Sequence, residues 1–366
     1  MREAFRLHPF QTETLAALQA PGHVICVAPT GSGKSLIYER FSQMRPARTL
    51  LISPLVALGR QQQARLEARG FQVWLGMGPE GRTNSSRKQS EYWIVSPEKL
   101  EESPSTVHAL KDWRPDWMVV DECHCLWEWG REFRPAYRKV PALIAQLGLR
   151  RSLWLTATLP YVARRELRAE IPTPLREIGE FAFPESLIIH AWRVNHVDRA
   201  QALLDTVAAR PGRGIVFVQT REDTHRLARL LGSFRPLPYH AGLGSEEKRA
   251  IELRLNQGEC RVLIATSAFG LGMDIRELDW VVLWEPPRSL LALAQALGRV
   301  GRAGRPGEAF VFWEPADAAR GGPSVMNWLH DLRCRRVSIA PYFAGPDASP
   351  AVTACGRCDR CRSARY

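Results

Sequence analysis

Residues 28–35 read APTGSGKS, a glycine-rich turn that ends in a lysine and a serine. An apolar run at residues 24–27 precedes the turn and a helical pattern follows it, which predicts a buried strand that turns into a helix. In that setting backbone N–H groups converge on a polyphosphate, Lys34 reaches the outer phosphates, and the Ser35 hydroxyl coordinates Mg²⁺. A glycine-rich turn that binds nothing is the alternative. We expect a nucleoside triphosphate, contacted by Thr30, Gly31, Ser32, Gly33, Lys34 and Ser35.

Two adjacent carboxylates follow a second apolar run. Residues 117–120 (WMVV) deliver Asp121 and Glu122 to what would be the carboxyl edge of a parallel sheet, where ligands sit in open α/β folds. We expect Asp121 to hold Mg²⁺ through its water shell and Glu122 to orient and deprotonate the attacking water. Phosphoryl transfer needs mainly positioning and charge neutralisation, so a lysine, a metal and one base cover one side of the nucleotide.

Residues 295–302 (QALGRVGR) are the candidates for contacts on the far side of the γ-phosphate. Arg299 and Arg302 lie three positions apart and could act as arginine fingers on the transition-state charge. The alternative is a solvated helix face, the usual place of such a pair, but the flanking glutamine and glycines argue against it. The predicted catalytic set is therefore Lys34, Asp121, Glu122, Gln295, Arg299 and Arg302.

The eight cysteines fall into two groups. Cys334 precedes a second cluster by 20 intervening residues, and the cluster itself has two-residue gaps, the spacing by which a loop wraps tetrahedral zinc. Four thiolates would make a closed, structural Zn²⁺ site, with disulfides as the alternative that a cytosolic chain disfavours. The predicted ligands are Cys334, Cys355, Cys358 and Cys361. The remaining cysteines, which we expect to be buried thiols, are Cys26, Cys123, Cys125 and Cys260.

Taken in chain order, these motifs resemble those of the superfamily 2 helicases and, within them, the RecQ family. Nearly the whole chain is covered. Two features resemble RecQ proteins in particular, the aromatic-rich residues 124–137 that directly follow the carboxylates and the terminal cysteine cluster. The resemblance rests on residues 8–11 (HPFQ), 28–35, 53–55 (SPL), 61–62 (QQ), 96–98 (SPE), 121–124 (DECH), 156–158 (TAT), 214–217 (GIVF), 239–243 (YHAGL), 265–274 (ATSAFGLGMD) and 295–302.

The resemblance implies further roles for residues outside the phosphate site. Gln11 would help to bind the nucleotide base, and single-stranded DNA would lie across both lobes and be moved 3′ to 5′. Aromatic rings and a planar guanidinium stack on bases without regard to sequence. For Trp127 we favour a core position, and Ser53 and Thr266 could equally cap helices. The expected DNA-binding and coupling residues are Ser53, His124, Trp129, Phe133, Arg134, Thr156, Thr158 and Thr266.

Composition agrees with a nucleic-acid partner. The 366 residues carry 50 Lys and Arg against 38 Asp and Glu, a formal charge of +12, and counterion release makes such an excess useful on a phosphate backbone. We find no secretory signal and no apolar stretch of membrane-spanning length. We therefore expect a cytoplasmic, nucleoid-associated monomer that binds single-stranded DNA and tailed or forked duplexes, makes no membrane contact, and has protein partners that the sequence does not identify.

Alternating apolar strands and helices predict an α/β protein with two doubly wound parallel-sheet lobes. The family resemblance implies that these lobes are RecA-like and that a small C-terminal zinc-binding subdomain follows them. Expected strands include residues 49–53, 93–95, 152–155, 187–191, 214–218, 261–265 and 280–283, and expected helices include residues 58–69 and 161–170. The expected domains are residues 1–178 (ATP-binding lobe), 179–314 (second lobe) and 315–366 (short helical and zinc-binding subdomain). Each lobe lacks the other's chemistry, so hydrolysis would require both to close on ATP.

Some positions depart from the family pattern. His8 stands where the family usually has Arg, and residues 313–334 have room for little more than one helix. No winged-helix or helicase-and-RNase-D C-terminal domain follows Cys361, so we expect weak unwinding. The function that we infer is an ATP-dependent 3′-to-5′ DNA helicase or translocase that uses ATP, Mg²⁺ and Zn²⁺ in DNA repair or recombination. The alternatives are an RNA helicase of the same superfamily and an ATP-gated DNA clamp that does not unwind.

Overall fold

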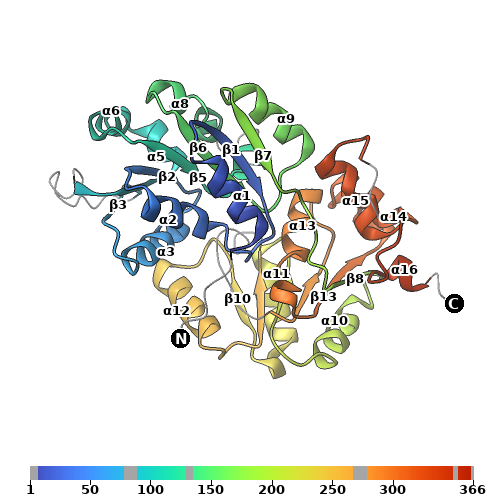
Figure 1. Cartoon of the computed structure of the whole chain (residues 1–366). Coiled ribbons are helices and arrows are strands. Elements are labelled where there is room, and N and C mark those ends of the chain that lie inside the picture. The colour runs from blue at the N-terminus through green and yellow to red at the C-terminus, as the bar shows by residue number, and fades with distance from the viewer. Residues whose placement is uncertain (1–6, 78–88, 129–134, 267–277, 349–352, 364–366) are drawn as a thin grey trace, which may run out of the picture. The chain divides into compact units, whose positions relative to one another are not determined.

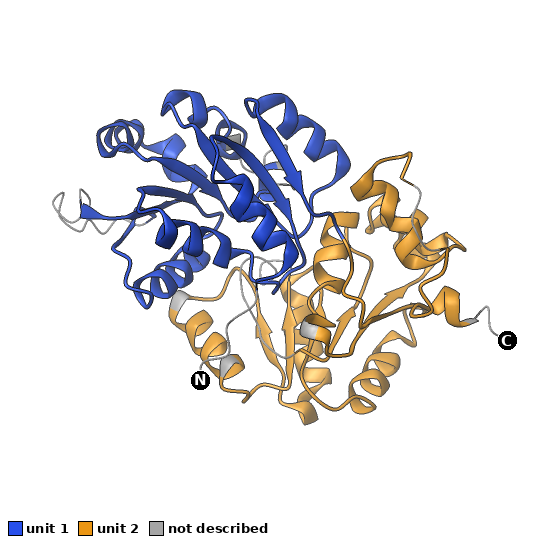
Figure 2. Ribbon diagram, viewed as in Figure 1, with its two compact units in different colours: residues 1–181 blue, residues 182–366 orange. Residues whose placement is uncertain are grey.

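The computed structural model describes residues 7–77, 89–128, 135–266, 278–348 and 353–363. The chain divides into two compact units, residues 1–181 and 182–366 (Figure 2). Each unit is built on its own parallel sheet covered by helices (Figure 1). Among the described residues, no helix has both the length and the apolar character that crossing a membrane requires.

The sheet of unit 1 has the strand order β3-β4-β2-β5-β6-β1-β7, and every neighbouring pair in it is parallel. Parallel neighbours need helical crossovers, which accounts for a helix between most strands. The strands are β1 (Gly22–Val27), β2 (Thr49–Ile52), β3 (Val73–Leu75), β4 (Tyr92–Val95), β5 (Trp117–Val120), β6 (Arg151–Thr156) and β7 (Leu175–Ile178). The helices are α1 (Pro9–Ala17), α2 (Ser35–Met44), α3 (Val56–Glu67), α5 (Pro97–Glu102), α6 (Pro104–Trp113), α7 (Cys125–Glu128), α8 (Leu143–Gln146) and α9 (Tyr161–Glu170), with a 3₁₀ turn at Pro135–Lys139.

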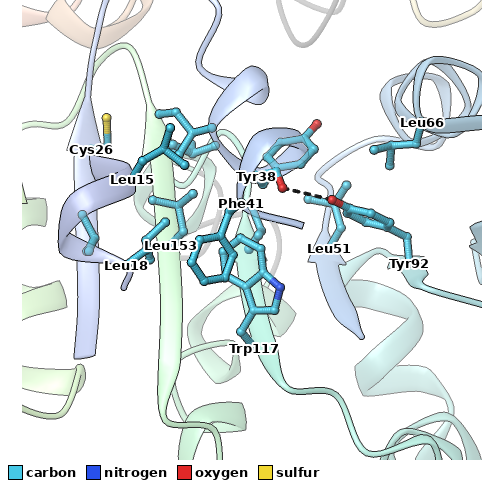
Figure 3. Close-up of a cluster of buried hydrophobic side chains, with 14 of the residues drawn as sticks. Leu15, Leu18, Cys26, Tyr38, Phe41, Leu51, Leu66, Tyr92, Trp117 and Leu153 are labelled. Atoms are coloured by element: carbon cyan, nitrogen blue, oxygen red, sulfur yellow. Dashed lines mark hydrogen bonds between the residues drawn. The ribbon is translucent and has the colours of Figure 1, made fainter. Parts of the chain in front are cut away.

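Successive residues of the central strands alternate between two cores, one on each face of the sheet. Leu153 packs with α1, α2 and α3 on one face, where the rings of Phe41 and Trp117 meet at a tilt with centroids 4.6 Å apart (Figure 3). Its neighbour Trp154 packs with α6, α8 and α9 on the other. Each fully buried large apolar side chain contributes about 1.5–3 kcal/mol. The carboxyl edge of this doubly covered sheet is thereby held rigidly for the site residues that follow β1, β2, β5 and β6.

Unit 2 repeats the arrangement with the strand order β10-β11-β9-β12-β13-β8, again all parallel. Val216, Ile264 and Phe310 pack against α10 and α11 on one face of the sheet. The strands are β8 (Leu187–Arg193), β9 (Gly214–Phe217), β10 (Leu237–Tyr239), β11 (Val262–Ala265), β12 (Trp280–Leu283) and β13 (Gly307–Trp313). The helices are α10 (Arg199–Ala208), α11 (Arg221–Leu230), α12 (Ser245–Asn256), α13 (Leu290–Leu297), α14 (Pro323–His330), α15 (Arg335–Ala344) and α16 (Asp359–Ser363), with 3₁₀ turns at Gly232–Phe234, Arg302–Gly304 and Pro315–Ala319.

The predicted fold class is confirmed. Both lobes are doubly wound parallel α/β layers, and four cysteines cluster near the end of the chain, with Cys334 before α15 and the other three before or within α16. Helix α14 is the one α-helix that the structure describes between Trp313 and Cys334, as the length of that segment predicted. The predicted helix at residues 58–69 begins two residues earlier, because α3 starts directly after its extended N-cap residue, Leu55.

Candidate functional site

The glycine-rich turn connects β1 to α2 as expected. Gly31 and Gly33 adopt φ angles of +78° and +80°, the left-handed region that favours glycine. The side chain of Lys34 is buried and donates to the carbonyl oxygens of Ala28, at 3.0 Å, and Pro29, at 3.2 Å. The first N–H groups of α2 have no carbonyl four residues earlier within the helix, which makes its N-terminus suited to a phosphate.

Gln11, a residue of α1, forms hydrogen bonds with the backbone of this turn. Its amide nitrogen donates to the carbonyl oxygens of Gly33, at 2.9 Å, and Ser32, at 3.3 Å, while its side-chain oxygen accepts from the His8 N–H at 2.8 Å. A Cβ at Gly33 would lie 3.0 Å from that amide nitrogen, so glycine allows the contact. Ser32 donates its hydroxyl to the Pro29 carbonyl, and Thr30 lies half-buried at the tip of the turn. The structure therefore places Gln11 against the backbone of the turn.

The metal-binding oxygens expected for Mg²⁺ lie at the same edge. Ser35 begins α2, and Asp121 follows β5. A hydroxyl and a carboxylate are the hard oxygen ligands that Mg²⁺ prefers, so the donor set fits this ion. Burial and the neighbouring Glu122 carboxylate raise the pKa of Asp121, and the nearby Lys34 ammonium opposes that shift. Lys34 is thus close enough to Asp121 for its charge to act on that carboxyl group.

Glu122 has a strained backbone. Its φ of +49° lies in the left-handed region, an uncommon conformation for a residue with a side chain, and such strain concentrates at functional sites. Its Oε2 atom lies 3.2 Å from Nδ1 of His124, a residue that is almost fully buried. The same Nδ1 lies 2.9 Å from Oγ1 of Thr156. A chain of polar contacts thus joins the residue after β5 to the end of β6.

The Thr156 hydroxyl fixes the proton of this imidazole. Thr156 Oγ1 donates to the Thr158 carbonyl, at 3.0 Å, and accepts from the Thr158 N–H, at 3.1 Å. A hydroxyl has one proton, so the contact with His124 requires Nδ1 to donate. The Nδ1 proton then also faces the carboxylate of Glu122. His124 therefore holds Glu122 and Thr156 in one network, in which the backbone of Thr158 takes part.

The segment after β2 carries a buried hydroxyl without a partner among the described residues. Ser53 is fully buried, and its Oγ makes no hydrogen bond there. The N-cap of α3 is Leu55, so Ser53 does not cap that helix. Tyr137 donates its hydroxyl to the carbonyl of Pro54 at 2.9 Å and so ties the end of the aromatic-rich segment to this strand end. Trp129, Phe133 and Arg134 lie outside the described residues, as does the side chain of Trp127.

Two further contacts come from α3, which carries Gln62, a residue of a motif (61–62) for which we predicted no role. Gln62 Nε2 donates to Asp121 Oδ2 at 2.6 Å, and Arg65 Nη1 donates to Ser35 Oγ at 2.6 Å. Sequence reasoning missed Arg65 because nothing in the local pattern of a polar helix says which side chain faces a strand end. Helical spacing would place Gln62 and Arg65 on one face, and that is the signal that was available.

In unit 2 the predicted arginines follow α13, which ends at Leu297. Arg299 is 7% exposed, so the alternative of a solvated helix face is wrong for it. Arg302 Nε donates to the Gly298 carbonyl at 3.1 Å, and Gly301 turns the chain at a φ of +75°. Gly301 leaves no room for a side chain, since a Cβ there would lie 3.0 Å from the backbone of Leu187. Gln295 lies on α13 itself, and Thr266, which follows β11, is 9% exposed.

The four predicted cysteines lie together, and their sulfur atoms are all within 4.8 Å of one another. Two pairs, Cys355 with Cys361 and Cys334 with Cys358, are each 4.0 Å apart, about twice a disulfide bond, so the disulfide alternative is wrong for this structure. A tetrahedron of thiolates around zinc has S–S separations of about 3.8 Å, which fits. Although burial opposes ionisation, the N–H groups of Val337 and Arg336 at the start of α15 lower the pKa of Cys334 to about 7.

Arginines around the cluster attach it to unit 2. Arg335 is 1% exposed, pairs with Asp359 at 2.9 Å and lies over the ring of Trp328. Arg336 donates to three backbone carbonyls before and within β8, among them that of Pro184 at 2.7 Å. Cys358 forms a backbone bridge with Ile189 of the same strand. The remaining cysteines, Cys26, Cys123, Cys125 and Cys260, are buried free thiols, as predicted.

Comparison with known proteins agrees with this geometry. Residues 8–166 match the DEAD/DEAH box helicase domain, and residues 196–304 match the helicase conserved C-terminal domain. The ATP-dependent DNA helicase RecQ of Pasteurella multocida is 27% identical over 390 aligned residues, which cover 96% of this chain and 59% of that protein. These matches are consistent with a RecQ-type helicase of superfamily 2. The chain spans about six-tenths of the length of the curated RecQ relatives that it matches.

Solved structures share the fold of this chain. The helicase Lhr of Mycobacterium smegmatis, solved with single-stranded DNA and AMP-PNP, superposes with a TM-score of 0.68 at 22% identity and covers 88% of this chain and 48% of its own. Dbp5 of S. cerevisiae, solved with RNA and ADP BeF3, superposes with a TM-score of 0.69 at 16% identity, and the match covers 93% of this chain and 93% of Dbp5. Because one neighbour holds DNA and the other RNA, the fold alone does not choose between the two nucleic acids.

Proposed function

We propose that this chain is an ATP-dependent DNA helicase or translocase of RecQ type that moves 3′ to 5′ on single-stranded DNA and opens tailed or forked duplexes in DNA repair or recombination. The observation that carries the proposal is the polar edge of unit 1. There Lys34, Ser35, Asp121 and Glu122 follow two strands of one parallel sheet, and the strained Glu122 backbone holds its carboxylate against His124. That arrangement suits phosphoryl transfer to water.

Each residue of this edge has a part in hydrolysis. Lys34 and the N-terminus of α2 bind the β- and γ-phosphates, while Ser35 and Asp121 hold Mg²⁺, which neutralises charge on the phosphates when bound. Glu122 orients a water and takes its proton, and the Nδ1 proton of His124 keeps that carboxylate in place. Gln11 positions the turn around the phosphates. In unit 2, Arg299 and Arg302, with Gln295 nearby, supply the positive charge that stabilises the transition state.

DNA contacts are proposed for strand ends and for the aromatic-rich segment. The Oγ of Ser53, which is buried and has no hydrogen-bond partner among the described residues, is suited to donate to a phosphate oxygen. Thr156 and Thr158, which share the network of His124, would report DNA to Glu122. Thr266 is proposed for a similar backbone contact in unit 2. Trp129, Phe133 and Arg134 would stack on bases.

The four cysteines are proposed to hold a structural zinc ion. Their sulfur separations support this, because four thiolates around a tetrahedral zinc ion lie at such distances from one another. Four sulfurs leave no open coordination position, so the cluster stabilises the C-terminal helices and takes no part in hydrolysis.

The proposal is tested by ATPase and strand-separation assays on duplexes with 3′ or 5′ single-stranded tails. Lys34→Ala should lose nucleotide binding, because the substitution removes a phosphate contact. The unmodified chain should hydrolyse ATP faster in the presence of single-stranded DNA than in the presence of RNA. Faster turnover on RNA would favour an RNA helicase. Hydrolysis without strand displacement or movement on DNA would favour a clamp, and opening of 5′-tailed substrates alone would refute the polarity.

Coupling to DNA is tested separately with Trp129→Ala, Phe133→Ala and Arg134→Ala. These side chains follow the carboxylates in sequence and carry no predicted phosphate contact with ATP. Basal ATPase should therefore remain, and its stimulation by single-stranded DNA should fall. Unchanged stimulation in all three variants would exclude the aromatic-rich segment as a DNA sensor.

A further inference from the structure

Helix α3 sends a row of donor side chains toward the phosphate-binding edge of unit 1. Gln62 Nε2 lies 2.6 Å from Asp121 Oδ2, and Arg65 Nη1 lies 2.6 Å from Ser35 Oγ. One turn on, just past the C-cap of the helix, Arg69 Nε lies 2.9 Å from Oε2 of Glu39. Spacings of three and four residues put all three donors on one face of the helix.

Two of these donors engage the same oxygens that the proposed function assigns to Mg²⁺. A hydrogen-bond donor and a cation both use the lone pairs of an oxygen, and a guanidinium adds repulsion toward a divalent cation. Both short contacts therefore oppose metal binding at Ser35 and Asp121. The same helix, α3, thus presents both donors to the two oxygens.

Arg65 has a second partner, so its release from Ser35 costs little free energy. Its Nε lies 2.6 Å from Oε1 of Glu39, a residue of α2 whose side chain is fully buried. A buried carboxylate requires a positive partner, so the ion pair with Glu39 holds Arg65 in place whether or not Nη1 contacts Ser35. Arg69 shares the same carboxylate through its other oxygen and, among the residues that the structure describes, has no hydrogen bond or ion pair with Ser35 or Asp121.

We propose that Arg65 is a positioning residue that competes with Mg²⁺ for Ser35, so that α3, with Gln62 at Asp121, sets the Mg²⁺ concentration at which the chain binds nucleotide. This inference rests on the proposed ATP site. The guanidinium of Arg65 does not contact nucleotide in this scheme. It restrains the Ser35 hydroxyl until the metal replaces it, and Glu39 retains the displaced side chain.

The test is a titration of Mg²⁺ from an EDTA-treated baseline at a fixed concentration of a fluorescent, non-hydrolysable ATP analogue, with bound fluorescence as the readout. Arg65→Ala should lower the half-saturating Mg²⁺ concentration about three- to tenfold, the size of one net hydrogen bond at a site where Arg65 is partly exposed. Arg69→Ala is the matched control, because it also loses one ion pair with Glu39, and it should stay within about twofold of the unmodified chain. Affinity for the analogue in EDTA should not change in either variant.

The outcomes separate the inference from the proposed function. An unchanged or higher Mg²⁺ requirement in Arg65→Ala overturns the competition, and weaker binding in EDTA would mean that Arg65 contacts phosphate instead. If the unmodified chain shows no Mg²⁺-dependent binding at all, the proposed ATP site itself fails. Should Arg65→Ala fold poorly because Glu39 loses a partner, the double variant with Glu39→Gln removes that buried charge and must show the same shift.

Discussion

The two units hold their site residues by different means. In unit 1, side chains from separate elements bind one another, as in the chain from Glu122 through His124 to Thr156. In unit 2, Arg302 depends on a tight backbone turn, in which Gly301 packs against Leu187 and a Cβ added at Gly307 would clash with the Gly301 nitrogen. A shared network passes a change at one residue to its neighbours, whereas a packed turn confines the effect to the turn.

The C-terminal helices depend on the cysteine cluster more than any other part of unit 2 depends on one contact. Loss of the cluster should therefore have the largest effect on stability. Structural zinc contributes an apparent ~10–16 kcal/mol in small modules, so Cys355→Ser should lose the metal and strongly destabilise the C-terminal helices. Metal content and thermal unfolding measure this. The matched control is Cys260→Ser, a buried thiol of the same unit outside the cluster, which should keep about one zinc per chain. A Cys355→Ser protein with full zinc and full stability would exclude the site.

The next largest effects are expected from the proposed catalytic residues, the arginine finger Arg302 in unit 2 and the general base Glu122 in unit 1. Arg302→Ala should lower ATP turnover at least ~10³-fold if the arginine acts as a finger, and Glu122→Gln should lower it about 10²–10⁴-fold as the loss of a general base. Both should still bind nucleotide, measured as equilibrium affinity beside steady-state ATPase. Arg305→Ala, an exposed neighbour, should hydrolyse normally. Near-normal hydrolysis by either variant would remove that residue from the mechanism.

Removing one threonine hydroxyl from each unit compares the side-chain network of unit 1 directly with a contact confined to one helix of unit 2. Thr156→Val deprives His124 and the Thr158 N–H of a partner, so the free energy of unfolding should fall by about 1–3 kcal/mol, and ATPase should fall with it. Thr206 in unit 2 donates only to the Ala202 carbonyl of its own helix, and Thr206→Val should cost about 1 kcal/mol or less without changing ATPase. Equal effects on ATPase would mean that the network in unit 1 carries no coupling.

The smallest expected effect concerns the tie between Tyr137 and Pro54. Tyr137→Phe removes one buried hydrogen bond, worth about 0.5–1.5 kcal/mol of stability, and should weaken the stimulation of ATPase by DNA. Tyr92→Phe loses hydroxyl contacts with Tyr38 and Ser42 within the core shown in Figure 3. It should cost similar stability, seen in denaturant unfolding, and leave DNA stimulation intact. If both variants respond alike to DNA, the Tyr137 contact is structural only.

Much of this architecture could be predicted because its signals are local. The turn around Gly31 and Gly33 requires left-handed φ angles that glycine provides, and the gaps between Cys355, Cys358 and Cys361 are short enough for one ion to bridge. Apolar runs likewise predicted the central strands, because a parallel strand is buried on both faces. The sequence alone thus determined the elements, the residue types at their ends and the cysteine cluster.

Only the tertiary structure decided which side chains meet. Gln62 reaches Asp121 across 59 positions, Arg65 reaches Ser35 across 30, and Arg336 reaches Pro184 across 152. No local pattern encodes such pairs, because each depends on how a helix is rotated over the sheet and on which strands are neighbours. The strain at Glu122 has the same origin, since packing around the strand end imposes a φ that glutamate does not adopt by itself.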